Sequence, residues 1–307
     1  MSKIAVIGSS GYIGSYLTQS LKNKHKILSH SRNKINGRIY NKNIFKKITG
    51  DIKNYKTIKK IINQKPNVII YTISLNHIDS EENISKSIEN NFLPLVNLVK
   101  EIIKKNMKVK IIYLSTMQVY GREYTKKIIN EDYQKNIQNI YALTHSMCED
   151  LLSSYSHILD FHCLRISNVY GMPTLKKINC WWLVINDFCR NAVMNNKIII
   201  NSDGSALRDF IHLSTIYEVV SALIKKKESL PFINVCSGKT FSIKQIAFKI
   251  ANNSFFKGKV DVIIKKKSKK NKKKFYYNTS NLKKLSVNSS SKFDTKITQF
   301  LECLTKN

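Results

Sequence analysis

The stretch "KIAVIGSSGYIGS", residues 3–15, contains the pattern that decides the fold. Its apolar first half is typical of a β-strand, and it leads into Gly8, Gly11 and Gly14 in G-x-x-G-x-x-G spacing before a helical pattern begins. Glycines at this spacing permit a tight turn and a close backbone approach to a pyrophosphate, whose charge then lies at a helix N-terminus. A glycine triplet can also form a purely structural turn, but its place between a strand and a helix favours a dinucleotide site. The residues predicted to bind the dinucleotide in this loop are Gly8, Ser10, Gly11, Tyr12, Ile13 and Gly14.

Strand-type and helical patterns alternate along the first half of the chain, which is typical of a parallel sheet wrapped by helices. The expected strands are 3–8, 25–31, 67–73 and 109–115, and the expected helices are 12–22, 55–64 and 83–105. After about residue 170 the alternation loosens, and most aromatic and charged loops lie there. We therefore expect an α/β fold: a Rossmann-type doubly wound parallel sheet over residues 1–170, and a smaller substrate-binding lobe over residues 171–307, from which some segments return to the sheet.

Length and composition exclude several classes of protein. With 307 residues, 42% of them hydrophobic, the chain can bury a full core as one large domain or two unequal lobes. Its longest apolar runs, such as "VIIYTISL" and "CWWLVI", fall well short of the roughly 20 residues needed to span a bilayer, and the N-terminus lacks the layout of a signal peptide. The six cysteines are scattered, with neither a disulfide framework nor metal-ligand spacing. We expect a cytoplasmic protein without a metal and without a membrane partner.

The formal net charge of +32 raises the alternative of nucleic-acid binding, because clustered cations release counterions from phosphates. The lysines are spread along the whole chain, however, so a global compositional bias explains them better. The exception is the run "KKKSKKNKKK" at 265–274, which we interpret as a mobile surface loop with a weaker attraction for anionic substrate. We expect no nucleic-acid partner.

The end of the second expected strand bears on the cofactor. An acidic residue there would accept hydrogen bonds from a free ribose 2′-hydroxyl, but this strand ends "SHSRN", residues 29–33, with Arg32 and no carboxylate. A guanidinium suits a 2′-phosphate, which favours NADP(H) over NAD(H). The alternative, that Arg32 is one more surface cation of a basic protein, stays open.

Further motifs follow in a fixed order: "GDI" at 50–52, "STMQVYG" at 115–121, "YALTH" at 141–145, "LRISNVYG" at 164–171, "DGSALRDFIHLSTI" at 203–216 and "NVCSGKTFSIKQIA" at 234–247. In this order and at these separations, and over nearly the whole chain, they resemble the extended short-chain dehydrogenase/reductase family. Its members are NAD(P)-dependent epimerases, dehydratases and reductases of nucleotide sugars. The resemblance implies a nucleotide-sugar substrate and a homodimer.

The resemblance also implies roles for single residues. Thr116 matches the family's catalytic Ser/Thr, which bonds the reacting sugar oxygen, and Tyr141 matches the tyrosine that transfers the proton and contacts the cofactor. Asp51, with Ile52 beside it, falls where the family contacts adenine. The residues expected at the substrate's sugar and diphosphate are Asn168 and Arg208, and Asn91 matches an asparagine that supports the active-site strand.

His145 departs from the family, which has a lysine four residues after the tyrosine. That lysine orients the nicotinamide ribose and lowers the pKa of the tyrosine by its charge. A helix places positions i and i+4 on one face, so Tyr141 and His145 can address the same object, and we expect His145 to contact cofactor in the active site. A histidine, with an ordinary pKa near 6.5, is mostly neutral at pH 7 and supplies little of the charge.

The direction of reaction follows from this neutrality. Oxidising an alcohol needs the tyrosine as a base, whereas reducing a ketone needs it protonated, which a neutral neighbour tolerates. The family's 4,6-dehydratases follow the threonine with an Asp-Glu pair, and here Met117 and Gln118 stand instead. We expect an NADPH-dependent reductase of a 4-keto nucleotide sugar, destined for a surface polysaccharide. The alternatives are an NAD-dependent C4 epimerase and a catalytically impaired protein that binds dinucleotide or nucleotide sugar.

Overall fold

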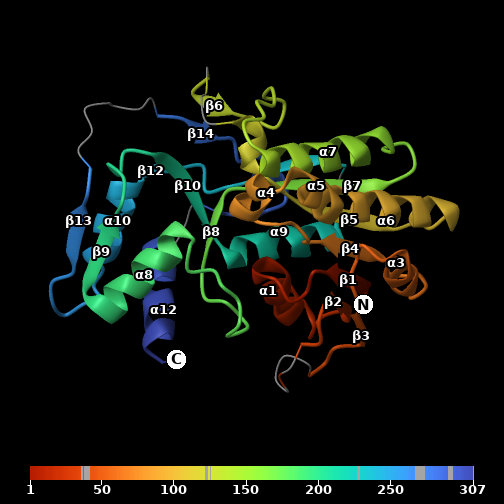
Figure 1. Ribbon diagram of the computed structural model, residues 1–307, viewed down its shortest axis with the longest axis horizontal. Helices are drawn as coiled ribbons and strands as arrows, with labels where there is room; N and C mark the ends of the chain where they lie inside the picture. The colour runs from red at the N-terminus through yellow and green to blue at the C-terminus, as the bar shows by residue number, and fades with distance from the viewer. Residues whose placement is uncertain are drawn as a thin grey trace. The chain divides into compact units, whose positions relative to one another are not determined.

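The computed structural model describes residues 1–35, 37, 42–121, 124, 126–226, 229–266, 274–289 and 293–306 (Figure 1). The chain forms two compact units. The first comprises residues 1–123, 132–166 and 220–233, and the second comprises residues 124–131, 167–219 and 234–307. The division into a cofactor domain and a substrate lobe at residue 170 stays a prediction.

The first unit is built on a seven-stranded sheet in the order β11-β7-β5-β4-β1-β2-β3, and its register from β7 to β3 is parallel throughout. The strands are β1 (Lys3–Ile7), β2 (Lys26–Ser31), β3 (Lys46–Thr49), β4 (Val68–Tyr71), β5 (Lys110–Thr116), β7 (Asp160–Ile166) and β11 (Phe232–Val235). The order reverses between β1 and β4, which is the switch point where doubly wound sheets bind ligands. The expected α/β class and Rossmann-type sheet are confirmed.

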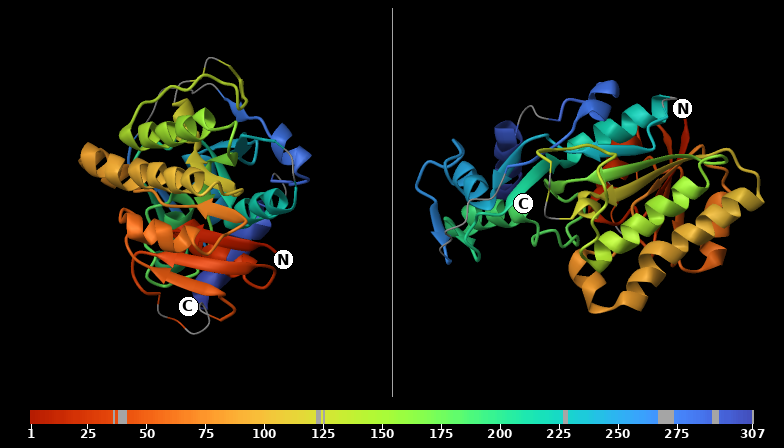
Figure 2. Two further views of the ribbon diagram at one scale, coloured as in Figure 1. Left: turned by 90° about the vertical axis from the view of Figure 1, so that its right-hand side faces the viewer. Right: turned by 90° about the horizontal axis from the view of Figure 1, so that it is seen from above.

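Helices cover both faces of this sheet. They are α1 (Tyr12–Leu21), α3 (Tyr55–Ile62), α4 (His77–Glu82), α5 (Ile84–Ser87), α6 (Leu93–Lys104), α7 (Ile140–Ser154) and α9 (Leu213–Lys225), the last running from the second unit into the first. Side chains of α3, α6 and α7 join one apolar cluster with alternate residues of the strands, so these three helices share a face. Figure 2 shows α9 on the opposite face from α6 and α7.

The helix expected over 83–105 is interrupted. After α5 the backbone forms a π-helical turn, Ile88–Phe92, and α6 then begins, with Pro94 in its first turn. A π-helical turn widens the backbone locally and is frequent at functional sites. Here it carries Asn91, whose side chain is 1% exposed. Apolar periodicity does not distinguish such a turn from the α-helix around it, which is why the sequence indicated one helix.

The second unit has its own apolar core. Its strands are β6 (Ile128–Ile129), β8 (Asn168–Tyr170), β9 (Lys197–Ile200), β10 (Leu207–His212), β12 (Thr240–Ser242), β13 (Asp261–Ile264) and β14 (Tyr276–Tyr277). They form a sheet in the order β12-β10-β8 and the pairs β13-β9 and β14-β6. The helices are α8 (Val184–Asn195), α10 (Ile243–Ala251), α11 (Ser280–Lys284) and α12 (Phe293–Thr305), and α8, α10 and α12 pack with β9 around Ile198.

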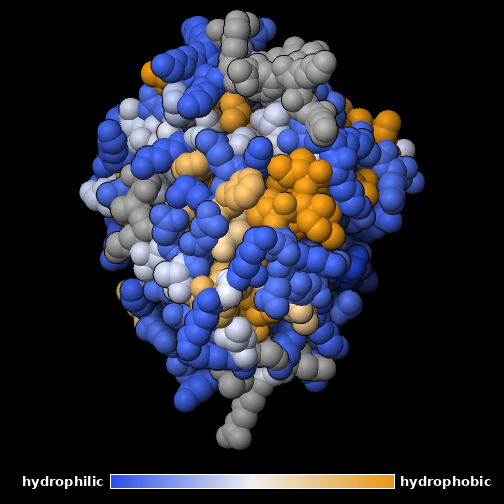
Figure 3. Space-filling model, turned by 90° about the vertical axis from the view of Figure 1, so that its left-hand side faces the viewer, coloured by the Kyte–Doolittle hydropathy of each residue, from blue (hydrophilic) through white to orange (hydrophobic). Residues whose placement is uncertain are grey.

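The face drawn in Figure 3 is mostly hydrophilic, and its largest apolar patch lies right of centre. Of the basic run at 265–274, residues 267–273 lie outside the described residues, so its expected mobility stays a prediction. Within the described part of the chain, no helix combines the length and apolar character that crossing a membrane requires.

Candidate active site

The glycine-rich loop follows β1 at the switch point of the sheet. Gly8 has a φ of +91°, and a Cβ there would lie 2.5 Å from Thr72 Oγ1, so only glycine fits. A Cβ at Gly14 would lie 2.2 Å from the Gly8 carbonyl oxygen, which shows how closely α1 approaches the loop. Gly11 precedes α1 without a side chain to cap it, and the first turn holds no acidic residue. These residues fit a dinucleotide whose phosphates lie at the N-terminus of α1.

The residues predicted around the adenosine lie on the same edge. Arg32 directly follows β2 and is exposed. Asp51 follows β3, and its Oδ1 accepts a hydrogen bond from the Lys53 amide at 2.9 Å. The side chain of Ile52 is 5% exposed and belongs to the core. Ser10 is exposed beside Gly11, while Tyr12 and Ile13 open α1. Their contacts with cofactor stay predictions.

Three hydroxyl groups meet where β4 and β5 end. Thr116 is the last residue of β5, Ser74 lies just beyond β4, and Tyr141 is in the first turn of α7. The hydroxyls of Thr116 and Ser74 lie close enough to the Tyr141 hydroxyl to lower its pKa. Asn139 fixes the start of α7, because its Oδ1 accepts a hydrogen bond from the Ala142 amide at 2.7 Å. Thr116 and Tyr141, both expected at the site, are thus brought together.

His145 lies beside Tyr141, as the spacing of four indicated. The two rings are 4.6 Å apart between centroids, edge to face. His145 Nδ1 is 2.7 Å from the Tyr113 hydroxyl, and Nε2 is 3.2 Å from Ser74 Oγ. The ring is 2% exposed, and a ribose hydroxyl would have to displace one of these partners. Contact between His145 and cofactor therefore stays a prediction.

Burial sets the protonation of this pair. It lowers the pKa of His145 to about 4, against a smaller opposing effect of the Glu149 carboxylate, so the imidazole is neutral at pH 7. Tyr141 is only partly buried as a residue, but the protein around its hydroxyl displaces water and raises its pKa to about 12. The nearby hydroxyls of Thr116 and Ser74 lower that pKa and are outweighed. Tyr141 is therefore protonated at neutral pH and can give a proton to a substrate oxygen.

One turn further along α7, Glu149 is fully buried and paired. Its Oε1 accepts from Ser115 Oγ at 2.6 Å, and its two oxygens accept from Arg165 Nε at 3.0 Å and Nη2 at 2.8 Å. The Lys135 ammonium is 3.1 Å from Oε2. Although burial raises the pKa of Glu149, the Arg165 guanidinium, Ser115 and Lys135 together bring it below its ordinary value. This network ties α7 to β5 and β7 directly behind Thr116.

Asn91 supports the same edge of the sheet. Its Oδ1 accepts a hydrogen bond from the Leu75 amide at 2.7 Å, and its Nδ2 donates to Thr144 Oγ1 at 3.0 Å. Asn91 thereby fixes both the backbone next to Ser74 and the helix that carries Tyr141.

The residues expected to bind the substrate lie in the second unit, on the neighbouring strands β8 and β10. Asn168 Nδ2 donates to the Asp209 carbonyl at 2.9 Å, and Arg208 Nη1 donates to the Leu207 carbonyl at 2.8 Å. Between them Asp209 is 1% exposed, and burial raises its pKa to about 6 against the opposing hydrogen bonds of Ser237 and Ser167. The structure thus brings Asn168 and Arg208 together, with part of each side chain's hydrogen bonding used within the protein.

The sequence model of the NAD dependent epimerase/dehydratase family matches residues 4–236. The chain belongs to this family. A dTDP-D-glucose 4,6-dehydratase of Dictyostelium discoideum is 27% identical over 278 residues, covering 83% of this chain and 62% of that relative. A GDP-6-deoxy-D-talose 4-dehydrogenase of Aggregatibacter actinomycetemcomitans is 24% identical over 246 residues, covering 80% and 77%. The chain therefore spans less than two thirds of the first of these relatives.

Solved structures share the fold of this epimerase/dehydratase chain. The UDP-N-acetylglucosamine 4-epimerase from Methanobrevibacter ruminantium superposes with a TM-score of 0.86 at 22% identity, covering 99% of this chain and 98% of that one. A Thermus thermophilus UDP-glucose 4-epimerase solved with NAD has a TM-score of 0.83 at 17% identity, covering 99% of each chain. The RMD protein from Pseudomonas aeruginosa, solved with NADPH, has a TM-score of 0.80 at 15% identity, covering 100% and 99%. Proteins of this fold thus bind either cofactor.

The similarity to a dehydratase does not extend to acidic residues after Thr116. Met117 is 4% exposed, and Gln118 Oε1 accepts a hydrogen bond from Asn139 Nδ2 at 3.1 Å. Neither side chain exchanges protons near neutral pH, so this member of the epimerase/dehydratase family lacks the Asp-Glu pair at that place.

The two hydrogen-bond partners of His145 were not foreseen. Ser74 lies at the carboxyl end of a parallel strand, where ligand-binding residues gather, and that position is a signal the sequence offered. Tyr113 lies inside β5 and is 1% exposed, and its sequence context is that of a core aromatic. Only the packing of α7 against β5 shows that its hydroxyl meets His145.

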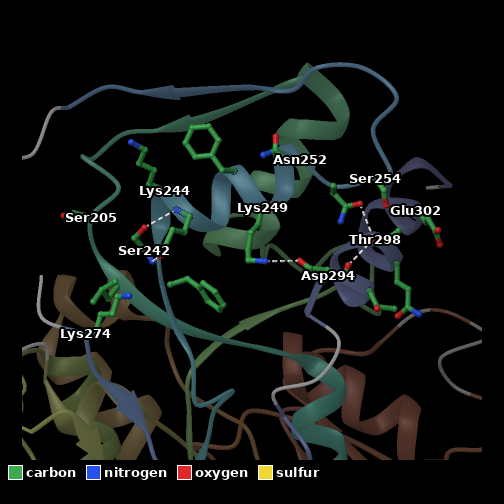
Figure 4. Close-up of a pocket in the computed structure, with 17 residues that line it drawn as sticks. Ser205, Ser242, Lys244, Lys249, Asn252, Ser254, Lys274, Asp294, Thr298 and Glu302 are labelled. Atoms are coloured by element: carbon green, nitrogen blue, oxygen red, sulfur yellow. Dashed lines mark hydrogen bonds and ion pairs between the residues drawn. The ribbon is translucent and has the colours of Figure 1, made fainter. Parts of the chain in front are cut away.

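The second unit also has a pocket of about 1230 Å³ between α10, α12 and β12 (Figure 4). Lys244, Lys249 and Asp294 lie along it, and Lys249 Nζ is 3.4 Å from Asp294 Oδ1. Among the described residues that line it, none is a predicted cofactor or substrate residue of the epimerase/dehydratase family. Both signs of charge are present, so charge alone selects no ligand.

Proposed function

We propose that this protein is an NADPH-dependent reductase that acts on the ketone of a 4-keto nucleotide sugar. The observation that carries the proposal is the position of the buried His145 ring, 4.6 Å from the ring of Tyr141 and hydrogen-bonded to the hydroxyls of Tyr113 and Ser74, because these neutral surroundings keep the imidazole uncharged. A tyrosine whose pKa is about 12 is an acid at pH 7, and ketone reduction needs an acid at this position. A base, which oxidation needs, would require a strongly lowered pKa.

When bound, the reduced cofactor supplies a hydride to the carbonyl carbon of the substrate. Thr116 then holds the carbonyl oxygen through its hydroxyl, which lies next to the hydroxyl of Tyr141. As negative charge grows on that oxygen, Tyr141 donates its phenolic proton and an alcohol results. Because Thr116 ends a buried strand and Tyr141 lies in a capped helix, both donors are positioned before substrate arrives.

The cofactor assignment rests on Arg32 and on the absence of an acidic residue in β2. A guanidinium forms two parallel hydrogen bonds to a phosphate, and no carboxylate at the end of β2 repels that phosphate. NADPH is accordingly the preferred cofactor in this proposal, with NADH as the weaker one. Proteins of the same fold have been solved with each.

The substrate would be held by Asn168 and Arg208, the latter on a phosphate oxygen. The similarity to a protein named as a GDP-6-deoxy-D-talose 4-dehydrogenase supports chemistry at C4 of a deoxy sugar. In this proposal the product is a precursor of a surface polysaccharide, and the enzyme works as a cytoplasmic homodimer.

A second candidate is an NAD-dependent C4 epimerase, which the fold similarity to a UDP-N-acetylglucosamine 4-epimerase favours. An epimerase must use Tyr141 first as a base and then as an acid within one cycle. Its first half-reaction is slow when the tyrosine holds its proton strongly, so the geometry supports the reductase better.

The experiment is an assay of purified protein with several nucleotide 4-keto sugars and either NADPH or NADH, preceded by mass spectrometry of any copurified dinucleotide. The reductase oxidises NADPH in step with the loss of ketone and copurifies with no tightly held NAD. Copurified NAD together with interconversion of C4 epimers would establish the second candidate. Binding of nucleotide sugar without any turnover would instead identify an impaired protein that only binds.

A further inference from the structure

The residues that directly follow β4 lie against the glycine-rich loop. Thr72, the first of them, donates a hydrogen bond from Oγ1 to the Ile7 carbonyl at 2.9 Å, and the same oxygen lies 3.2 Å from the Gly8 carbonyl oxygen. The contact is tight, because a Cβ at Gly8 would lie 2.5 Å from Thr72 Oγ1, and a Cβ at Gly14 would lie 2.7 Å from it. A displacement of the segment 72–75 would therefore displace the loop at which the dinucleotide is predicted to bind.

The far end of the segment 72–75 is held by two side chains. The Leu75 amide donates a hydrogen bond to Asn91 Oδ1 at 2.7 Å. Ser74 Oγ donates to the Leu75 carbonyl at 2.7 Å and lies 3.2 Å from His145 Nε2. Since Asn91 is in the π-helical turn and His145 is in α7, the segment is tied to both of these helical elements.

The direction of the hydrogen bonds around His145 follows from the number of protons. Ser74 has one hydroxyl proton, which it donates to the Leu75 carbonyl, so Ser74 Oγ accepts from His145 Nε2. Burial keeps the imidazole neutral, and a neutral imidazole protonated on Nε2 has its lone pair on Nδ1. The Tyr113 hydroxyl, 2.7 Å from Nδ1, is therefore the donor at that nitrogen. Tyr113 keeps its proton for this bond, because burial holds the pKa of its hydroxyl well above the ordinary value.

We propose that Ser74, His145 and Tyr113 are positioning residues of the dinucleotide site: Tyr113 orients the imidazole, the imidazole holds Ser74, and the segment 72–75 is thereby kept against the glycine-rich loop. Both ring nitrogens of His145 are used within the protein, so His145 acts on the cofactor through Ser74 and not by contact with a ribose hydroxyl. This inference rests on the proposed NADPH-dependent function. No covalent bond is made or broken in it.

The arrangement suits a histidine and not a lysine. An imidazole offers an acceptor at one nitrogen and a donor at the other, and both are matched, by Tyr113 in β5 and by Ser74 just beyond β4. A lysine ammonium has three donors and no acceptor, so the Tyr113 hydroxyl would have to turn its proton elsewhere. His145 and Tyr113 therefore belong together as one device.

Titration of NADPH into single variants tests the positioning role. Ser74→Ala should raise the NADPH Kd by about 3- to 10-fold, the range for a lost neutral hydrogen bond, and Tyr113→Phe should raise it by about two- to fivefold. Direct contact between His145 and the ribose predicts otherwise for Ser74→Ala, because the freed Nε2–H would then bind the ribose at least as well. A Kd of Ser74→Ala equal to or below that of wild type would overturn the proposal.

A double-mutant cycle tests whether Tyr113 acts through Ser74. In the double variant Ser74→Ala/Tyr113→Phe the NADPH Kd should equal that of Ser74→Ala alone, and additive effects would overturn the proposal. Tyr71→Phe is the matched control. Tyr71 pairs in register with Tyr113 on the adjacent strand β4 and is fully buried, and among the residues that the structure describes its hydroxyl has no hydrogen-bond partner. Equal losses of binding from Tyr71→Phe and Tyr113→Phe would show that packing, and not the hydrogen bond, is responsible.

Two substitutions of His145 separate hydrogen bonding from the filling of space. His145→Gln keeps an N–H donor on a side chain of similar reach, whereas His145→Leu fills a similar volume without one. The NADPH Kd of His145→Gln should stay within about threefold of wild type, and that of His145→Leu should rise by about tenfold. Equal losses in the two variants would overturn the proposal.

The tautomer of His145 gives a readout that needs neither cofactor nor turnover. Nitrogen NMR of the histidine rings, with His145 assigned by its loss in His145→Gln, should show a neutral ring protonated on Nε2 at pH 7. A ring protonated on Nδ1, or a cation, would overturn the inference whether or not the protein is active.

Failure of the proposed function is distinguishable from failure of this inference. A wild type that reduces no keto sugar, while the NADPH Kd values of the variants follow the expected order, would refute the reductase and leave the positioning role standing. A wild type that binds neither NADPH nor NADH would refute both.

Discussion

His145 and Glu149 lie one turn apart on the same helix, but the His145 side chain is neutral and the Glu149 side chain is ionised. Both are almost completely buried. His145 has only neutral partners, Ser74 and Tyr113, and burial keeps it uncharged. Glu149 has two cations, Arg165 and Lys135, and stays ionised.

The difference shows where this fold places positive charge around α7. Two cations surround the carboxylate that ties α7 to β5 and β7, whereas the ring of the reacting Tyr141 lies 4.6 Å from the neutral His145. Charge therefore secures the scaffold, and the group beside the reacting tyrosine is neutral. The predictions below test this division, beginning with the largest effect.

Tyr141→Phe should remove the proton donor that lies beside the neutral His145. Turnover should fall by about 10²- to 10⁴-fold, the range for losing a positioned acid, while cofactor binding largely survives. Steady-state kinetics together with dinucleotide titration measures both quantities. Near-normal turnover would mean that the proton comes from another group, and that the neutral surroundings of Tyr141 serve something else.

Glu149→Gln should break the ion pairs of this carboxylate with Arg165 and Lys135. Removing this carboxylate leaves the buried Arg165 guanidinium without its charge partner, so the free energy of unfolding should fall by about 3–5 kcal/mol in urea denaturation near pH 7. Asp150→Asn is the matched control: this neighbouring carboxylate also contacts Lys135, at 2.7 Å, but its side chain is 68% exposed. Loss of that surface pair should cost about 0–1 kcal/mol.

The stability that Glu149 contributes should also depend on pH in a defined direction. Its pKa in the folded protein is below the ordinary value. The contribution is therefore fully present above the unfolded value of about 4.3 and is lost as pH falls through the folded pKa. In Glu149→Gln this acid-side loss should be smaller, and an identical pH dependence in both proteins would contradict the assignment.

His145→Lys should place a positive charge beside the reacting Tyr141. A cation beside Tyr141 favours the phenolate, so ketone reduction near neutral pH should change little or fall, whereas oxidation of the alcohol should improve. In the wild type, oxidation should rise about tenfold per pH unit over neutral pH because the pKa of Tyr141 is about 12, and the lysine should shift this profile to lower pH. Equal gains in both directions, or reduction only by the variant, would show that His145 is a handicap.

Arg32→Ala tests an exposed cation that lies outside the core. If Arg32 binds a 2′-phosphate, the preference for NADPH over NADH should shrink by about tenfold, with little change in stability. Arg190→Ala, at an arginine over the Trp181 ring in the second unit, is the control and should leave the preference unchanged. Equal or tighter binding of NADH by the wild type would reverse the cofactor assignment.

The sequence was informative where local chemistry is sufficient. The glycine spacing required close approach of α1 to the loop, and the interval of four between Tyr141 and His145 required that the rings meet on one helix face. Glu149 lies one further turn along the same helix, but the sequence did not indicate it as part of the site.

The partners of His145 could not be inferred in this way. Tyr113 and Tyr71 look alike as aromatic residues within buried strands. Only the packing of α7 against β5 gives the Tyr113 hydroxyl a partner, whereas the Tyr71 hydroxyl has none among the residues that the structure describes. The π-helical turn at Ile88–Phe92 was also missed, because a one-residue widening of the backbone leaves the apolar periodicity almost unchanged.

The edge strand β11 has a consequence for biosynthesis. It is the outermost strand of the large sheet beside β7, and the Pro231 carbonyl accepts a hydrogen bond from the Cys163 amide at 2.7 Å. A nascent chain emerging from the ribosome completes β7 long before residues 231–235 have been synthesised. During that interval β7 is an uncovered apolar edge, the kind that pairs with other chains and aggregates. Fragments truncated before residue 231 should therefore be insoluble on expression, although they contain every residue of the hydroxyl cluster.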